Sequence, residues 1–231
     1  MKQLSVISLG LGVQSTMLYY LSSLDMLPRA DVAIFADTGG EKIGTLIYLK
    51  YLKKWAKENN GIPIIVDKSK NLYRDLLNQK NTENDRFSSI PAFTKGNDGN
   101  IGMLRRQCTN EYKIQVVDQA IRKLYKLKPR QRNIETIIWK GISIEEIERM
   151  TIPEAKWKVF YYPFCGYTID SKGGFVRDKN EQIASRSNII ELYKKMGLPV
   201  PPKSSVPLKS ADLKKDQTKL DFGECSGNCH I

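Results

Sequence analysis

The sequence contains very little histidine and no long hydrophobic run. Its one histidine, His230, excludes a Ser-His-Asp hydrolase and a histidine-rich catalytic metal centre. The longest apolar stretches, such as residues 4–11, are far shorter than the ~20 residues that span a bilayer, so no membrane association is expected. Four cysteines do not form the framework of a small secreted protein. With no signal-peptide pattern at the start, these absences predict a cytoplasmic protein.

Charge of one sign is in excess. Lysine and arginine number 37 against 25 acidic residues, which gives a net charge of +12. Such an excess favours polyanionic partners, namely nucleotides, nucleic acid or sulfate esters. It does not choose among them, and a lysine-rich surface that only keeps the protein soluble explains it equally well. No basic run interleaved with aromatic residues, of the RNA-binding kind, occurs.

Short apolar runs alternate with helical periodicity over the first 140 residues. Strands are expected at residues 4–9, 31–36, 62–66 and 135–139, and helices from residue 13, at 43–55 and at 112–125. The apolar faces of the last two helices are expected to hold Leu46, Ile47, Leu49 and Leu52, and Ile114, Val117, Ile121 and Leu124. The alternation predicts an α/β fold, a doubly wound and mostly parallel sheet with helices on both faces.

The rest of the chain carries weaker signals. Residues 78–102 are polar, lack a period and are expected to form a mobile loop. After residue 150 we expect a turn at 170–174, a short helix at 189–196 and a proline-rich connector at 199–207. The predicted organisation is one nucleotide-binding domain over residues 1–150 and a small irregular extension over 151–231.

The first segment with chemical meaning is a glycine-containing turn between a predicted strand and a predicted helix. Glycines let the backbone approach an anion, and the N–H groups and dipole of the following helix attract it. The expected nucleotide-binding residues here are Ser8, Gly10, Gly12, Gln14, Ser15 and Thr16. No Gly-Lys-Ser/Thr follows and the third glycine of a dinucleotide-binding turn is missing. A tight turn without a ligand is the alternative.

Two further segments lie where a parallel sheet presents ligand-binding residues. Asp37, Thr38 and Gly39 follow the second predicted strand, where Asp37 could hold magnesium through water or orient a ribose. Glu41 is expected to stabilise the N-terminus of the next helix. A third helix opens with cationic residues suited to phosphate or sulfate and with a cysteine of lowered thiol pKa, namely Arg105, Arg106, Cys108 and Lys113.

A fourth segment follows the strand predicted at residues 135–139. Ser143 precedes a short helical stretch and Glu146 lies three residues later, a spacing that predicts a capping box. The capping box gives no role to Arg149. It is expected either to reach a substrate from the end of the strand or to form a surface ion pair.

These four segments resemble the phosphoadenosine phosphosulfate reductase family of the PP-loop superfamily. The similar elements are Gly-Leu-Gly-Val-Gln-Ser at 10–15, Asp-Thr-Gly with a later threonine at 37–45, Arg-x-Cys-Thr-x-x-x-Lys at 106–113 and Gly-Ile-Ser-x-x-Glu-x-x-Arg-Met at 141–150. Gln14 stands where the superfamily has aspartate, and Leu11 where it has glycine. The resemblance implies a PP-loop adenine-nucleotide-binding fold whose first loop grips phosphate or sulfate groups.

The C-terminal tail contains Cys225 and Cys229, flanked by Glu224 and His230. Sulfonucleotide reductases carry a catalytic cysteine in a similar but shorter Glu-Cys-Gly-x-His stretch, whereas other relatives have Cys-x-x-Cys-Pro after Pro-Pro-Lys-Ser-Ser. Here the stretch at 201–205 runs directly into Val206-Pro-Leu, without that cysteine pair. The expected catalytic cysteines are Cys108, Cys225 and Cys229, and with Cys165 they supply enough thiolates for a four-iron four-sulfur cluster.

Three functions remain open on these residues. In the first, ATP with Mg²⁺ is cleaved between its α- and β-phosphates to adenylate an acceptor, such as nucleic acid, for attack by a sulfur donor. In the second, a tail thiolate attacks the sulfur of a sulfonucleotide (PAPS or APS), and a thioredoxin-like partner reduces the adduct. The third is a catalytically silent module that binds a nucleotide or nucleic acid. The sequence leaves the oligomeric state open.

Overall fold

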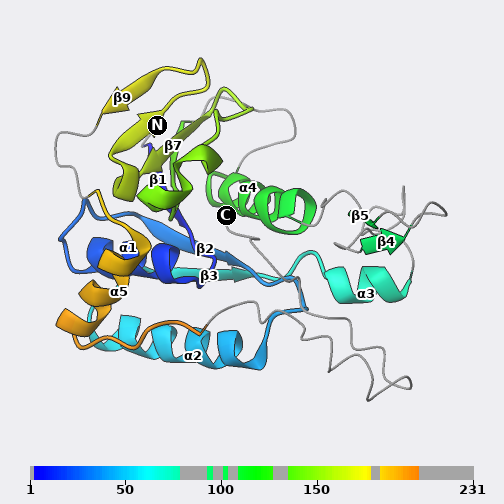
Figure 1. The fold of residues 1–231 in the computed structure, drawn as a ribbon, viewed down its shortest axis with the longest axis horizontal. Helices are drawn as coiled ribbons and strands as arrows, with labels where there is room; N and C mark the ends of the chain where they lie inside the picture. The colour runs from blue at the N-terminus through cyan, green and yellow to red at the C-terminus, as the bar shows by residue number, and fades with distance from the viewer. Residues whose placement is uncertain are drawn as a thin grey trace.

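The computed structural model describes residues 3–78, 93–95, 101–103, 109–126, 135–177 and 183–202. Its centre is a seven-stranded sheet in the order β3-β2-β1-β6-β7-β8-β9. Helices lie on both faces of this sheet (Figure 1). The expected α/β class with a mostly parallel sheet is therefore confirmed.

Five strands of the sheet are parallel and two are antiparallel. The parallel strands are β1 (Leu4–Ser8), β2 (Val32–Ala36), β3 (Ile64–Asp67), β6 (Thr136–Trp139) and β7 (Lys158–Tyr162). The strands β8 (Tyr167–Ile169) and β9 (Phe175–Arg177) extend the sheet from β7 in antiparallel pairing. Val6 lies opposite Val32 on one side and Ile138 on the other. The central strand β1 is therefore buried between two parallel neighbours, as its apolar sequence requires.

The helices cover the two faces unequally. The helices α1 (Val13–Ser23), α2 (Ile43–Glu58) and α5 (Arg186–Lys195) pack on one face, and α4 (Gln115–Leu124) packs on the other (Figure 1). Shorter elements complete the described chain: α3 (Leu72–Leu77), a π-helix η1 (Asn110–Ile114), the 3₁₀ segments η2 (Ile144–Arg149) and η3 (Pro163–Cys165), and the paired strands β4 (Phe93–Lys95) and β5 (Ile101–Met103). None of these helices is long and apolar enough to cross a membrane.

The face under α1, α2 and α5 is packed with aromatic rings whose hydroxyls are bonded. Tyr19 donates to the carbonyl of Ile62 at 2.7 Å, and Tyr193 of α5 donates to the carbonyl of Val13 at 2.9 Å. The ring of Tyr20 meets Trp55 edge to face at 4.6 Å between centroids. Each of these tyrosine hydroxyls has a partner, so the large rings are buried here without leaving their own polar atoms unpaired.

The predicted helices and strands of the first 140 residues are confirmed within a few residues, but two predicted core positions are wrong. Ile47 is 61% exposed and Leu124 is 41% exposed. The buried face of each helix is narrower than the apolar pattern indicates, and it includes Tyr48 in α2 and Ala120 in α4.

The segment at residues 78–102 was expected to form a mobile loop. The strands β4 and β5 pair in antiparallel fashion, so that expectation is wrong for those strands.

Beyond residue 150 the chain continues the same sheet. The expected turn joins β8 to β9, where the Asp170 carboxylate accepts hydrogen bonds from the backbone N–H groups of Lys172 and Gly174, both at 2.8 Å. The expected short helix is α5, and Ser185 and Asn188 form a capping box at its start. The strands β7, β8 and β9 were not predicted. The domain boundary at residue 150 stays a prediction.

Candidate functional site

The candidate site lies at the carboxyl edge of the parallel strands, where the strand order reverses. From β1 the chain moves outward to β2 and β3 on one side, and later enters β6 and β7 on the other. Open α/β sheets bind ligands outside the carboxyl ends of the strands at such a reversal. The loops after β1, β2 and β6 all lead from this edge, and they contain three of the four segments singled out in the sequence.

The loop after β1 presents the start of α1. Gly12 is the N-cap residue, and the first helical hydrogen bond runs from the N–H of Thr16 to the carbonyl of Gly12 at 3.0 Å. The preceding N–H groups of the first turn have no partner within the helix. The hydroxyl of Ser15 accepts from the N–H of Gly10 at 3.2 Å and bonds the carbonyl of Gly12 at 3.4 Å. This arrangement closes the loop and leaves helix N–H groups directed at an anion.

Leu11 holds the loop in a conformation that suits glycine. Its φ is +55°, in the left-handed region where an L residue with a Cβ costs about 1–2 kcal/mol. Its side chain is 1% exposed and belongs to the core under α1. Leu11 therefore keeps a backbone conformation that suits glycine, and burial of its side chain offsets the strain.

Gly141 joins the end of β6 to the loop. A Cβ at this position would lie 2.5 Å from the backbone N of Ser15 and 2.9 Å from the backbone carbon of Gln14. Only glycine lets the chain after β6 pass so close to the start of α1. The predicted fourth segment thus contacts the loop through its glycine.

Asp37, Thr38 and Gly39 form a turn at the end of β2. The Asp37 carboxylate is 9% exposed, accepts from the N–H of Gly39 at 3.0 Å and lies 3.3 Å from the ammonium of Lys68. Gly39 has a φ of +77°, and a Cβ there would collide with the side chain of Asn71. The turn is therefore fixed by a glycine and by residues that follow β3.

Glu41 connects the second predicted segment with the third. Its carboxylate lies 3.7 Å from the ammonium of Lys113 and accepts from the hydroxyl of Thr38 at 3.1 Å. Glu41 directly precedes Lys42, the N-cap of α2, and makes no capping hydrogen bond, so its expected stabilisation of the helix start could act only through charge. Glu41 also holds Lys113 of the π-helix near the β2 loop.

Gln14, Glu146 and Arg149 form a chain of contacts that sequence reasoning missed. The side-chain amide of Gln14, which is 2% exposed, donates to Glu146 at 3.0 Å. The guanidinium of Arg149 donates to the other carboxylate oxygen at 2.8 Å. The predicted capping box is wrong, because Ser143 makes no side-chain cap bond and Glu146 faces Gln14 instead. No signal in the sequence links positions 132 residues apart.

The cysteines are only partly described. Cys165 is 1% exposed and donates through Sγ to the carbonyl of Ile142 at 3.3 Å. Burial raises the pKa of this thiol to about 11, and the charge of Glu146 adds to the shift. At neutral pH the Cys165 thiol is therefore protonated in this environment, and whether it binds a cluster stays a prediction. Five predicted site residues lie outside the described residues: Arg105, Arg106, Cys108, Cys225 and Cys229.

Comparison of the sequence with known families and curated proteins gives no match. No model of a known protein family matches the chain, and no curated protein matches it. The site is therefore argued from its own residues. It brings together helix N–H groups, an acidic turn and two cations, Lys113 and Arg149, that are each held by a glutamate.

Proposed function

We propose that the chain is an adenine-nucleotide-dependent enzyme of sulfur metabolism with a PP-loop fold. The observation that carries the proposal is the meeting of the β1 loop, the Asp37 turn, Lys113 and Arg149 at the reversal of strand order. The strand order supports the fold, and the resemblance of the four segments supports the nucleotide. The favoured reaction is cleavage of ATP between its α- and β-phosphates with adenylation of an acceptor.

The residues suit a bound triphosphate. The first-turn N–H groups of α1 would receive phosphate oxygens, since they have no partner within the helix. Lys113 and Arg149 are already placed by Glu41 and Glu146, and a polyanion would compete with these glutamates for both cations. The carboxylate of Asp37 fits Mg²⁺, which prefers oxygen ligands. When bound, Mg²⁺ would neutralise charge on the phosphates.

The proposed step transfers an adenylyl group. An oxygen of the acceptor attacks the α-phosphorus, the bond from this phosphorus to the bridging oxygen breaks, and pyrophosphate leaves with the electron pair. The acceptor loses a proton to solvent and becomes an AMP ester, which a sulfur nucleophile then displaces to release AMP. Nucleic acid is the acceptor class that the net charge of +12 favours. The chain's own residues position the reacting groups and counter their charge.

A second candidate, a thiol-dependent sulfonucleotide reductase, is favoured by the course of residues 199–202. The Tyr48 hydroxyl donates to the carbonyl of Pro199 at 2.9 Å, and Pro202 lies 3.7 Å from a Cβ placed on Gly44. The segment therefore runs along α2 toward the helix start, which directly follows Glu41 at the site. In this reaction a tail thiolate attacks the sulfur of the sulfonucleotide, AMP or its 3′-phosphate leaves, and a dithiol partner releases sulfite from the adduct.

Nucleotide binding is tested with a glycine variant at the loop. Gly141→Ala places a methyl group against the backbone of Ser15, so we expect at least a tenfold loss of ATP affinity by calorimetry. The matched control is Gly44→Ala, where the new methyl meets Pro202 only at ordinary contact distance and affinity should not change. A folded Gly141→Ala protein that binds ATP as tightly as the wild type would refute the proposed site.

Turnover assays separate the candidates. Pyrophosphate release from ATP that survives alanine at Cys225 and Cys229 supports adenylation. Sulfite release from PAPS or APS that needs reduced thioredoxin and is lost in Cys225→Ser or Cys229→Ser supports the reductase. Binding without either product supports the silent nucleotide-binding or nucleic-acid-binding module and overturns both enzymes.

A further inference from the structure

A small cavity, lined mainly by apolar atoms with a few polar side chains at its wall, lies on the α4 side of the sheet, next to the candidate site. Its volume is about 10 Å³, the lower limit for one water molecule. Its polar lining consists of Ser8, Asp118, Lys140 and Lys158, and its apolar lining comes from α4, η1, β6 and β7. The Ser8 hydroxyl and the Lys140 amine are the two groups of this lining that can bond a water held here, and a buried water needs two to four such partners.

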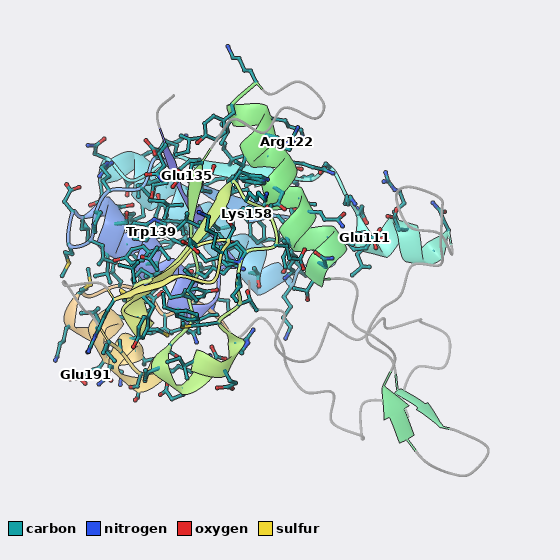
Figure 2. All side chains as sticks on the ribbon, turned by 90° about the horizontal axis from the view of Figure 1, so that it is seen from above. Glu111, Arg122, Glu135, Trp139, Lys158 and Glu191 are labelled. Atoms are coloured by element: carbon teal, nitrogen blue, oxygen red, sulfur yellow. The ribbon has the colours of Figure 1, made fainter. Side chains whose placement is uncertain are left out.

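Two ammonium groups share one carboxylate around this cavity. The ammonium of Lys158 lies 2.5 Å from the Asp118 carboxylate, and Figure 2 shows Lys158 beside α4. Lys140 is 8% exposed and its Nζ lies 4.0 Å from the centroid of the Phe160 ring. Burial, followed by the charge of Lys158, lowers the pKa of Lys140 to about 8, and Asp118 opposes the shift. Lys140 is thus the ammonium without a dedicated counterion.

The hydroxyl of Ser8 points to an additional ligand in the cavity. Ser8 is 0% exposed, and its Oγ has no hydrogen-bond partner among the described residues. A buried hydroxyl without a partner costs about 1–3 kcal/mol, so such atoms in folded proteins are usually satisfied by water. One water in this cavity can bond Ser8 and the amine of Lys140 together. The water-sized space and the unsatisfied hydroxyl are independent observations of the same site.

The cavity adjoins the phosphate-binding loop from the sheet side. Ser8 is the last residue of β1 and directly precedes the loop. Lys140 directly precedes Gly141, whose Cα lies against the backbone of Ser15. Ser8 and Lys140 line the same cavity, so a charge on Lys140 would act on an anion held by the loop through protein interior, where charges interact more strongly than in water.

We propose that Lys140 is a positioning residue that becomes fully protonated when a nucleotide occupies the loop, with one buried water joining its amine to the Ser8 hydroxyl. This inference rests on the proposed function, because the loop must bind phosphates. It goes beyond that function by assigning a protonation event to a residue outside the loop. Nucleotide binding then consumes a fraction of a proton whenever Lys140 is partly neutral.

The pH dependence follows from linkage. In the free protein, Lys140 loses its proton as the pH rises through about 8. A bound polyanion favours the charged amine and raises its pKa, so affinity is full below pH 8 and falls above it, by at most about tenfold per pH unit. The charged groups that face Lys140 are Asp118 from α4 and Lys158 from β7, with Glu154 acting on Asp118.

The test is proton uptake measured by titration calorimetry. The probe is α,β-methylene ATP with Mg²⁺ at pH 8.5, in Tris and in Bicine, two buffers with different ionisation enthalpies. For the wild type we expect uptake of more than half a proton per nucleotide, and an affinity several-fold weaker at pH 9 than at pH 7. Lys140→Met should show uptake near zero and a flat pH profile. Ser8→Ala should retain the fold and show reduced uptake.

The control is Lys195→Met on α5, an exposed lysine in an ion pair with Glu191, which should behave as the wild type. If Lys140→Met fails to fold, Lys140→Arg serves, since its permanent charge also abolishes uptake. Nucleotide binding with equal uptake in the wild type and the Lys140 variant would overturn this inference and leave the proposed function intact. Absence of nucleotide binding to the wild type at every pH would overturn both.

Discussion

The two faces of the sheet solve the burial of polar atoms differently. Under α1, α2 and α5, buried tyrosines such as Tyr19 and Tyr193 donate to backbone carbonyls. Under α4, the buried groups are the charged Lys140 and Lys158, which face the partly buried Asp118, and the hydroxyl of Ser8 has no protein partner among the described residues. The first face, here called the satisfied face, is an apolar core whose tyrosine hydroxyls are bonded, and the second, the charged face, carries charge in the interior.

The difference indicates where the fold trades stability for function. A buried charge without its own counterion costs free energy, and natural proteins tolerate such costs mainly at functional sites. The charged face adjoins the candidate phosphate loop, whereas the satisfied face holds the large aromatic core. Substitutions that remove groups from one face or the other test this contrast.

The largest effect is expected for Asp118→Asn, which leaves Lys140 and Lys158 buried without a carboxylate. Breaking a buried pair by removing one partner costs about 3–5 kcal/mol, and denaturant unfolding at pH 7 should show a loss of this size. The matched control is Glu191→Gln in the exposed pair with Lys195, where a change below about 0.5 kcal/mol is expected. Equal, small losses at both positions would show that the α4 face carries no buried charge of consequence.

The second effect has the opposite sign. Lys140→Met should stabilise the protein at pH 7 by about 3 kcal/mol, because the native pKa of about 8 lies below the ordinary value of 10.5 and each unit corresponds to about 1.4 kcal/mol. Between these values the unfolded chain binds more protons than the native one, so wild-type stability rises with pH.

The gain from Lys140→Met is therefore full below pH 8 and should vanish by about pH 10.5. Thermal unfolding of the wild type and the variant from pH 7 to pH 10.5 measures it. Lys195→Met is the control, since that ammonium is 69% exposed. A variant that is less stable than the wild type at pH 7 would contradict the account of the α4 face.

The third prediction weighs strain against burial on the aromatic face. Leu11→Gly relieves a left-handed conformation worth about 1–2 kcal/mol, but it removes a fully buried side chain whose loss costs about 2–5 kcal/mol. Burial wins, so we expect a net destabilisation of about 1–3 kcal/mol in urea unfolding. Leu11→Ala should lose slightly less burial and keep the strain. An increase in stability for the glycine variant would reverse the ranking of the two effects.

The smallest effect is expected for Tyr193→Phe, which removes one hydrogen bond from the satisfied face. Its partner, the Val13 carbonyl, also belongs to the first turn of α1, so the loss should be about 1 kcal/mol. Tyr51→Phe, at a residue that is 38% exposed, should change stability by less than about 0.5 kcal/mol. A loss above that of Asp118→Asn would show that the satisfied face is the more sensitive one.

The sequence predicts those strands and helices correctly whose apolar runs are long. The runs at β1, β2 and β6 are buried by neighbouring strands, and their patterns predicted them. The strands β7, β8 and β9 escaped because they carry mixed residues: Lys158 opens β7, and all three residues of β9 are exposed. Short strands of this kind owe their pairing to the rest of the sheet, and local propensity does not reveal them.

The candidate site was predicted where its residues are contiguous and missed where they meet only in the fold. The glycine turn, Asp37 and Lys113 stand in recognisable segments. The bond from Gln14 to Glu146 and the cluster of Lys140 with Asp118 depend on the register of β6 beside β1. A lysine that follows an apolar strand usually marks the point where the chain reaches the surface, so the sequence alone favours an exposed Lys140.

The π-helix at Asn110–Ile114 bears on how relatives of this chain should be aligned. A π-turn contains one residue more than an ordinary helical turn. Deleting Ile114 would restore an α-helical turn and rotate the residues before it, Lys113 among them, by about 100° relative to α4. Lys113 would then leave Glu41. A homologue without the π-turn should therefore be aligned with a single-residue gap here. An alignment without this gap would pair Lys113 with the wrong residue.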